Sequence, residues 1–555
     1  MAHAQPASQV VPPSFRPNLE RPGGFALPGA PGLVTPAGAE KLFVRLSGIE
    51  VKGGLPQLAE ATAVLERSLL GRPVSGAEIF AAARDLEAAY ARAGYVLVRV
   101  VLPPQTLVNG ARLKLIVVDG FIERVEFKDV PERIRFRISR LVEPLVGRRG
   151  LTQVEMERRI LLAGDTPGAI LRSTLAPGKA EGASILIIEA KYQPVSAILA
   201  IDNTMSKALG RTTMGTGLDL NGVAGLGELV YLRANGHPEG GDNGYFNRYP
   251  TNRSLAAGFV LPLWLDGLSF NAEVTDARTT PRETAGVQTT DVFQRMSLRL
   301  RYTWLRGRAT NFNSEVVFDA QDETQSLFVG GEPVPLSYDR LRIVRFSNDG
   351  DHFTPWGGLV SGRVTGSFGI DGLGARSAAD ATALLPFSRQ GADPNFRKLD
   401  VTLAYAQSLL EHLAFNVTAR AQTSFGEPLM RSEQIGIANI AGLSTFDAGS
   451  VVGDRGYVVR GEVSSPWPVP LPEAPFWAVV TPYVFAAYGE VVLEQPTALE
   501  AARVVAASYG GGLRIGGAVP GRLSNSGLTL EYGRASRTDG GAAAHRFTVI
   551  SATRF

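Results

Sequence analysis

The 555-residue chain contains no cysteine, and no uninterrupted apolar stretch reaches the roughly 18 residues that a membrane-spanning helix needs. Without cysteine, disulfide staples and thiolate metal sites are excluded. The five histidines, at positions 3, 237, 352, 412 and 545, are too scattered for metal-ligand spacing. Lys and Arg total 56 against 53 for Asp and Glu, and a net charge of +3 gives no argument for a nucleic-acid partner. The sequence therefore predicts neither a metal site nor nucleic-acid binding.

Motifs that carry catalysis are also scarce. Gly215-Thr216-Gly217 lacks the remaining glycine spacing and the following helix of a dinucleotide-binding loop. No Ser/His/Asp or paired-carboxylate constellation stands out. We therefore predict no catalytic residues and no cofactor, and we expect that the protein is not an enzyme.

What the sequence does contain is alternation of apolar and polar residues in many segments of about ten residues. One such segment places Met296, Leu298, Leu300, Tyr302 and Trp304 against Ser297, Arg299, Arg301 and Thr303. In the last eleven residues, Phe547, Val549 and Phe555 share one strand face, and Thr548 and Arg554 share the other.

This alternation favours strands with one oily face and one wet face. Arg299 and Arg301 have no apolar neighbour on their face, which suits a water-filled lumen better than a packed core. Aromatic residues at segment ends match an interfacial girdle. For any single segment a soluble all-β protein remains an alternative, but together the segments predict a transmembrane β-barrel.

The chain divides by composition into four parts. Residues 1–40 form a Pro/Gly-rich N-terminal segment and linker. Residues 41–120 and 121–194 each have a β-α-α-β-β pattern, which indicates two tandem small domains. Residues 195–555 lack helical periodicity and accommodate about sixteen strands. No signal peptide is visible at the N-terminus, and we expect that one has been removed.

Motifs in three of these parts resemble a known family. They are Tyr90 with Gly94-Tyr95 and Pro103-Pro104-Gln105, then Val117 to Ile122, Asp165 to Gly168, and Asp202-Asn203. This pattern resembles the TpsB transporters of two-partner secretion, the hemolysin activator family that includes ShlB, FhaC and HecB. The resemblance implies an α+β and all-β membrane fold: two tandem POTRA domains followed by a roughly 16-stranded antiparallel transmembrane β-barrel.

The resemblance also implies a function. We expect an outer-membrane pore with periplasmic POTRA domains that recognises an unfolded TpsA-like exoprotein and exports it. Outer-membrane lipid or lipopolysaccharide would surround the barrel, and we expect a monomer. An outer-membrane protein assembly insertase of the BamA-like superfamily is the alternative.

A client could be captured at an exposed sheet edge, which supplies main-chain hydrogen bonds without demanding a fixed sequence. The candidate edge is the strand predicted over Tyr95–Val101, beside the helix that carries Tyr90. The candidate binding residues are Tyr90, Tyr95, Val96, Leu97, Val98 and Arg99. The alternative that these residues only build the domain stays open.

In this family a long loop folds back into the lumen, and an Arg-Gly-Tyr/Phe tip pairs with an aspartate on the barrel wall. The matching loop here is about 426–456 and ends in Asp454-Arg455. Its tip has the sequence Ser444-Thr445-Phe446, without the arginine. On the wall, the segment that contains Phe485 has Ala487 in place of the aspartate.

The joint loss of both partners is physically coherent. Removing one member of a buried ion pair costs about 3–5 kcal/mol, whereas removing both can be nearly neutral. We therefore expect the loop still to enter the lumen, held by packing of Phe446 or by Asp447. Arg460 and Glu462 share the lumen face of a predicted strand, and we interpret them as part of the wall.

Overall fold

The computed structural model describes residues 6–11, 34–283, 286–470, 477–518, 524–540 and 544–555. The chain forms two compact units. One consists of Leu19–Tyr192 with Arg306–Arg308, and the other of Met1–Asn18, Gln193–Leu305 and Ala309–Phe555. Among the described helices, none combines the length and the apolar character needed to cross a membrane.

The smaller unit contains two similar sheet-and-helix domains. The first comprises β1 (Phe43–Arg45), β2 (Gly48–Lys52), α2 (Ala59–Leu69), β3 (Pro73–Ser75), α3 (Gly76–Arg92), β4 (Arg99–Val101) and β5 (Arg112–Val118). The second comprises β6 (Phe121–Lys128), α4 (Glu132–Val142), α5 (Gln153–Gly164), β7 (Ala169–Pro177) and β8 (Ala183–Tyr192). Their three-stranded sheets have the orders β2-β5-β4 and β6-β8-β7, with the last strand of each domain in the centre.

Helix α3 shows how local sequence fixes these elements. Ser75 caps its N-terminus in a reciprocal capping box with Glu78. Hydrogen bonds from the Ser75 backbone and from Arg72 lower the pKa of Glu78 to about 2. Four apolar side chains on one face of the helix are buried: Ile79, Ala83, Leu86 and Tyr90. Gly94 then takes a positive φ of 92°, which ends the helix.

The segment after α3 joins the two domains. Val96 and Leu97 are buried in the apolar core of the second domain. The Gln153 amide at the start of α5 donates a hydrogen bond of 2.8 Å to the Gly94 carbonyl. The strand predicted over Tyr95–Val101 is therefore too long, because only Arg99–Val101 pairs as a strand and the residues before it form a turn against the neighbouring domain.

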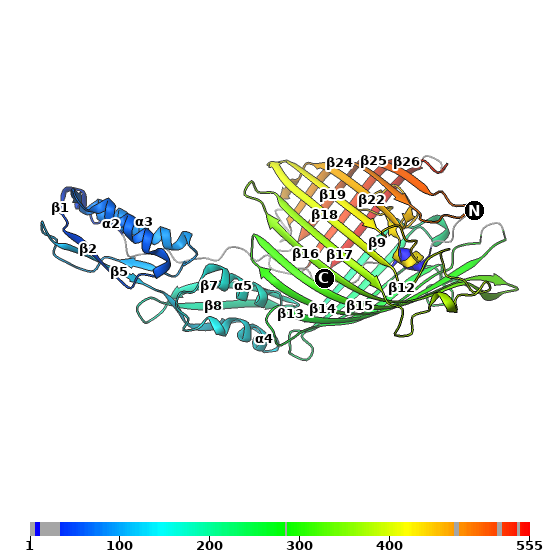
Figure 1. The fold of residues 1–555 in the computed structure, drawn as a ribbon, viewed down its shortest axis with the longest axis horizontal. Coiled ribbons are helices and arrows are strands. Elements are labelled where there is room, and N and C mark those ends of the chain that lie inside the picture. The colour runs from blue at the N-terminus through cyan, green and yellow to red at the C-terminus, as the bar shows by residue number, and fades with distance from the viewer. Residues whose placement is uncertain (1–5, 12–33, 284–285, 471–476, 519–523, 541–543) are drawn as a thin grey trace. The chain divides into compact units, whose positions relative to one another are not determined.

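The larger unit is a closed antiparallel barrel (Figure 1). Its first eleven strands are β9 (Val195–Asp202), β10 (Thr213–Asn221), β11 (Leu229–Gly236), β12 (Asn252–Pro262), β13 (Leu268–Thr279), β14 (Thr289–Arg306), β15 (Thr310–Val329), β16 (Glu332–Phe353), β17 (Leu359–Gly369), β18 (Arg397–Leu410) and β19 (Leu413–Thr423). The remaining segments are β22 (Arg455–Ser464), β23 (Trp467–Pro470), β24 (Trp477–Val492), β25 (Arg503–Ala518), β26 (Asn525–Arg537) and β27 (Ala544–Arg554).

Segments β22 and β23 both pair with β24 and form one interrupted strand, so the described residues give the sixteen strands predicted. Strand β27 pairs with β9 and closes the cylinder. The chain enters β9 from residue 194. The short turns 263–267 and 354–358 lie at the same end of the barrel. The opposite end carries the long loops 237–251, 370–396 and 424–454.

The predicted alternation decides which side of each strand faces outward. Met296 and Trp304 are 42% and 55% exposed on the outer wall, as membrane-facing side chains must be. Between them, Arg299 faces inward and pairs with Glu273 of the neighbouring strand at 3.0 Å. Arg554 also faces inward, where it pairs with Asp219 at 3.2 Å.

The prolines of the N-terminal segment suggested an extended linker, but residues 12–33, which contain most of these prolines, lie outside the described residues. Residues Ala7–Val10 form a short helix, α1, which lies among the barrel strands (Figure 1). Ala7 is buried with Ala277 and Phe293 of the inward face, and the Ser8 amide donates to a carboxylate oxygen of Glu323 at 3.2 Å. The barrel lumen therefore holds a piece of the chain that composition alone did not reveal.

We predict that Gly120→Ala destabilises the smaller unit. A Cβ at Gly120 would lie 2.1 Å from the Leu97 carbonyl oxygen, so the joint between the two domains must shift. Limited proteolysis of the full-length protein should cleave this unit several-fold faster than in the wild type. Gly164→Ala is the matched control, since its Cβ would meet nothing closer than 3.9 Å. Equal proteolysis rates for both variants would show that the joint is not tightly packed.

Candidate functional site in the barrel lumen

The loop between β19 and β22 is fastened at its root by Asp454. This loop contains η7 (Arg431–Glu433), β20 (Ile435–Gly436) and β21 (Val452–Gly453). The fully buried Asp454 carboxylate accepts hydrogen bonds from the Leu429 amide at 3.0 Å, the Gln434 side chain at 2.9 Å and the Glu494 amide at 2.7 Å. One carboxylate therefore ties both ends of the loop to the turn between β24 and β25.

A second attachment lies at the start of the loop. Glu433 is buried between two cations of the inward wall, Arg345 of β16 at 2.7 Å and Lys398 of β18 at 2.8 Å. Gln9 of α1 reaches the same place and donates its side-chain amide to the Arg431 carbonyl at 2.6 Å. The N-terminal helix and the loop are therefore held together inside the barrel.

The tip of the loop rests on an ion cluster supplied by the wall. Arg460 of β22 pairs with Glu462 of the same strand at 2.8 Å and with Glu531 of β26 at 2.6 Å. Its third contact is the hydroxyl of Ser444, to which it donates at 2.6 Å, and Ser444 in turn donates to Glu531. The Tyr483 hydroxyl donates to Glu531 at 2.7 Å. Arg460 and Glu531 are only 3% and 2% exposed.

Neighbouring tip residues add further contacts. The Thr445 and Ser508 hydroxyls share a hydrogen bond, and Phe446 is buried in an apolar cluster that includes Ala487. Asp447 forms an ion pair with Arg546 of β27. The two alternatives that the sequence left open, packing by Phe446 and pairing by Asp447, therefore occur together. The guanidinium of Arg460 also lies 3.9 Å from the ring centre of Phe485.

At this cluster both members of the ion pair belong to the wall, whereas the ion pair between loop and wall is made by Asp447 and Arg546. Arg460 of the wall supplies the cation of this cluster, and the tip contributes the neutral hydroxyl of Ser444. Ala487, at the expected aspartate position, packs against an apolar partner instead. If Ser444 leaves, Arg460 and Glu531 still neutralise each other, so releasing the tip costs hydrogen bonds worth about 0.5–1.5 kcal/mol each and strands no charge at this cluster.

The predicted client-binding residues do not form an open surface. Tyr90, Val96, Leu97 and Val98 are buried, and they build the first domain and the joint to the second. Tyr95 is partly buried against the first core. This placement favours the structural alternative that the sequence left open for their side chains.

The open edge of β4 is also occupied. The Val100 amide donates to the Glu87 carboxylate of α3 at 2.9 Å. Arg99 turns its guanidinium back onto the carbonyls of Val96 and Val98, at 3.0 and 2.9 Å. Because these backbone groups already have partners, a client strand would have to displace them.

Sequence reasoning missed the wall residues that receive the loop. Glu531, Ser508 and Arg546 lie more than sixty positions from the tip, and Glu433 was not singled out within the loop. Alternation marks Glu531 as inward-facing, since Leu530 and Tyr532 flank it on the other face. Nothing in a strand pattern reveals which inward residue meets which loop residue, because that depends on how the barrel closes.

Comparison with known proteins agrees with this architecture. The family described as haemolysin secretion/activation protein ShlB/FhaC/HecB matches residues 182–515, and the ShlB-type POTRA domain matches residues 44–120. Because the first match covers more than half of the chain, the protein belongs to the ShlB/FhaC/HecB family. Members of this family are transporters, and their POTRA domains lie in the periplasm beneath an outer-membrane barrel.

Individual relatives are distant. Outer membrane transporter CdiB of Dickeya dadantii is 23% identical over 398 residues, which cover 70% of this chain and 66% of that protein. Hemolysin transporter protein ShlB of Serratia marcescens is 27% identical over 42% of this chain and 40% of its own length. The structure of CdiB from Escherichia coli matches with a TM-score of 0.70 at 18% identity, covering 94% of each chain, which shows the shared fold.

We predict that Arg460→Met weakens the barrel strongly. Glu531 would keep its buried carboxylate without a cation, at a cost of about 3–5 kcal/mol. On denaturing gels the folded barrel migrates faster than the unfolded chain. The temperature at which this faster migration is lost should fall markedly. Arg514→Met is the matched control: Arg514 pairs with Glu462 at 2.8 Å but is 41% exposed, so its loss should cost less than about 1 kcal/mol. Equal shifts for both variants would refute a special role for the buried cluster.

Proposed function

We propose that the protein is an outer-membrane pore that recognises an unfolded exoprotein on its periplasmic side and exports it. The observation that carries this proposal is a lumen filled by α1 and the loop, both belonging to the same chain. Hydrogen bonds and ion pairs hold these segments against the wall. Contacts of this kind can be exchanged when another polypeptide enters, without unfolding the barrel.

The inward wall suits the passage of an extended chain. Arg299 pairs with Glu273, Arg301 with Asp349 at 2.8 Å, and Arg420 with Asp400 at 2.8 Å. Such neutralised pairs keep water in the lumen and give an apolar client segment no continuous surface on which to stick. The haemolysin secretion/activation family favours this export role over the insertase alternative.

We propose that the client is captured at the free edge of β7 rather than at β4. Strand β7 has nine residues and lies at the edge of its sheet, whereas β4 has three and is capped by Glu87. Solvent-exposed Arg172 and Thr174 leave this strand accessible. An extended client segment can pair with such an edge through its main chain, whatever its side chains are.

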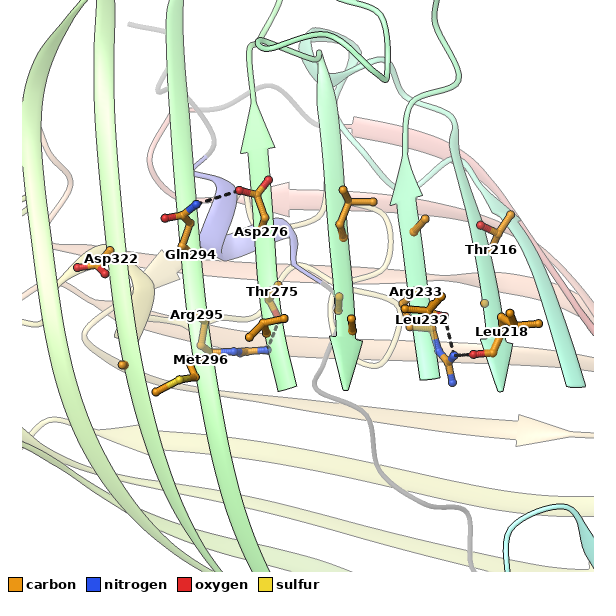
Figure 2. A pocket seen from close by; sticks show the side chains of 17 residues that line it. Thr216, Leu218, Leu232, Arg233, Thr275, Asp276, Gln294, Arg295, Met296 and Asp322 are labelled. Atoms are coloured by element: carbon orange, nitrogen blue, oxygen red, sulfur yellow. Dashed lines mark hydrogen bonds between the residues drawn. The ribbon is translucent and has the colours of Figure 1, made fainter. Parts of the chain in front are cut away.

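We also propose lipopolysaccharide as the lipid partner. A hollow of about 850 Å³ lies on the outer wall and is lined by apolar side chains that include Leu232, Leu255 and Met296 (Figure 2). At its rim Gln294 donates to Asp276 at 3.1 Å. This hollow is not part of the lumenal site, because the side chains of Leu232 and Met296 face away from the lumen.

Outward arginines stand next to this hollow, towards the long loops. Arg253 and Arg278 lie 3.7 and 3.0 Å from Asp276, and Arg340 lies 2.9 Å from Asp322. Three arginines against two aspartates leave a net positive charge. An apolar hollow beneath a cationic rim matches a phosphorylated glycolipid of the outer leaflet.

We propose that the protein is a monomer. A single chain suffices to form the pore, because the barrel closes on itself.

Releasing the loop should open the pore. We predict that Ser444→Ala combined with Asp447→Asn raises single-channel conductance several-fold in planar lipid bilayers, because the tip loses its contacts to Arg460, Glu531 and Arg546. Arg514→Gln is the control and should conduct like the wild type. Unchanged conductance in the double variant would show that the loop does not limit the lumen.

Capture at β7 can be tested by cross-linking, since the chain has no cysteine of its own. The probe is a TpsA-like exoprotein carrying one cysteine in its N-terminal region. Thr174→Cys should form a mixed disulfide with it during secretion. Val154→Cys, 72% exposed on α5 of the same domain, is the matched control and should not. Secretion without any preference for position 174 would argue against β7.

Lipid preference gives a separate test. We predict that lipopolysaccharide raises the temperature of barrel unfolding more than phosphatidylethanolamine does, and that Arg278→Ala combined with Arg340→Ala removes most of the difference. Arg514→Ala, in the lumen, should leave the difference in stabilisation between the two lipids unchanged. Equal stabilisation of wild type and double variant would exclude this rim as the binding site.

A further inference from the structure

The barrel closes through a short strand pairing. Strands β27 and β9 share five register pairs, from Ile550–Asp202 to Arg554–Ile198. The neighbouring pairing of β9 with β10 has eight. Fewer ladder hydrogen bonds make this seam easier to separate than the pairing beside it.

Asn203 prolongs the seam beyond the last pair. Its backbone amide donates to the Val549 carbonyl at 3.2 Å. Its side-chain amide donates to the Phe547 carbonyl at 2.9 Å and accepts from the Val549 amide at 2.9 Å. A side chain therefore takes over the role of the backbone where β9 turns away from β27.

Arg546 lies at the same point and joins three segments. It projects inward from β27 and is 9% exposed. Its guanidinium donates to the carbonyls of Asn203 and Met205, the latter at 3.1 Å, and pairs with Asp447 of the loop tip. Close by, the Ala448 amide of the loop donates to the Thr204 carbonyl at 3.0 Å. The loop tip is therefore bound to both strands of the seam.

We propose that Arg546 is a positioning residue that couples the lumenal loop to closure of the barrel wall. While Asp447 is docked, its carboxylate fixes the guanidinium across the seam. When the tip leaves, Arg546 loses its counter-charge and Thr204 loses the Ala448 amide. The seam is then held by its five ladder pairs, by the two backbone hydrogen bonds between Ala197 and Phe555, and by Asn203, and the barrel can widen there while the lumen is occupied. This inference concerns the wall itself and does not depend on which client passes.

The coupling is tested with a cysteine pair across the seam. Ala200 and Ala552 are register partners, and their replacement by cysteine gives the only disulfide that the chain can form. The membrane-inserted protein is oxidised in the presence of a maleimide, so that disulfide formation competes with labelling. A closed seam favours the disulfide, and a loosened seam favours the label.

We expect Asp447→Asn, a change in the loop alone, to lower the disulfide-to-label ratio at least threefold, and Arg546→Gln to do the same. Arg546→Lys keeps the charge opposite Asp447 but cannot reach both carbonyls, so its ratio should lie between Arg546→Gln and wild type. Arg514→Gln, which touches neither loop nor seam, should match the wild type.

Loop release is measured separately with Leu443→Cys, a fully buried position that a bulky maleimide reaches only when the tip has left. Where Asp447→Asn alone does not expose it, Ser444→Ala is added. An unchanged seam ratio in a variant whose loop is demonstrably released would overturn the proposal. A seam that responds to Arg546→Gln but not to loop release would also overturn it, since Arg546 would then be a seam residue only.

Discussion

Every strand in this barrel must find backbone partners on both sides, because lipid offers no alternative hydrogen bonds. Closure of β27 onto β9 is therefore the condition on which the membrane-spanning unit depends. Closure also creates an interior that water and charges can occupy. On the inward face of the barrel, charged side chains pair across neighbouring strands, as Arg299 and Glu273 do.

Charged and polar contacts also hold the loop inside the barrel, and their strength differs between the base and the tip of the loop. Its root at Asp454 and its first turn at Glu433 are held by buried carboxylates, which are costly to strip of their partners. Its tip meets the wall through the hydroxyls of Ser444 and Thr445 and through one ion pair, between Asp447 and Arg546. A loop built in this way is fastened more firmly at its base than at its tip.

The smaller unit shows a comparable division between fixed and available surfaces. Residues 95–98 are committed to the joint between its two domains, and Glu87 caps the short edge strand beside them. The longer edge strand, β7, remains available for pairing. Apolar, strand-forming sequence therefore does not by itself mark a binding edge, because burial against a neighbour and use by a client favour the same residues.

The sequence by itself determined the strand alternation, the repeated β-α-α-β-β pattern and the inward position of residues such as Arg460, because side-chain period is a local property of the chain. Through the family resemblance it also indicated that the usual arginine of the loop tip and the usual aspartate of the barrel wall were both missing. Only the tertiary structure decided what replaced them. Glu531 and Arg546 reach the tip because sixteen strands close at one register, and α1 enters the lumen despite a proline-rich surrounding. Such contacts join positions far apart in sequence, and no local pattern encodes them.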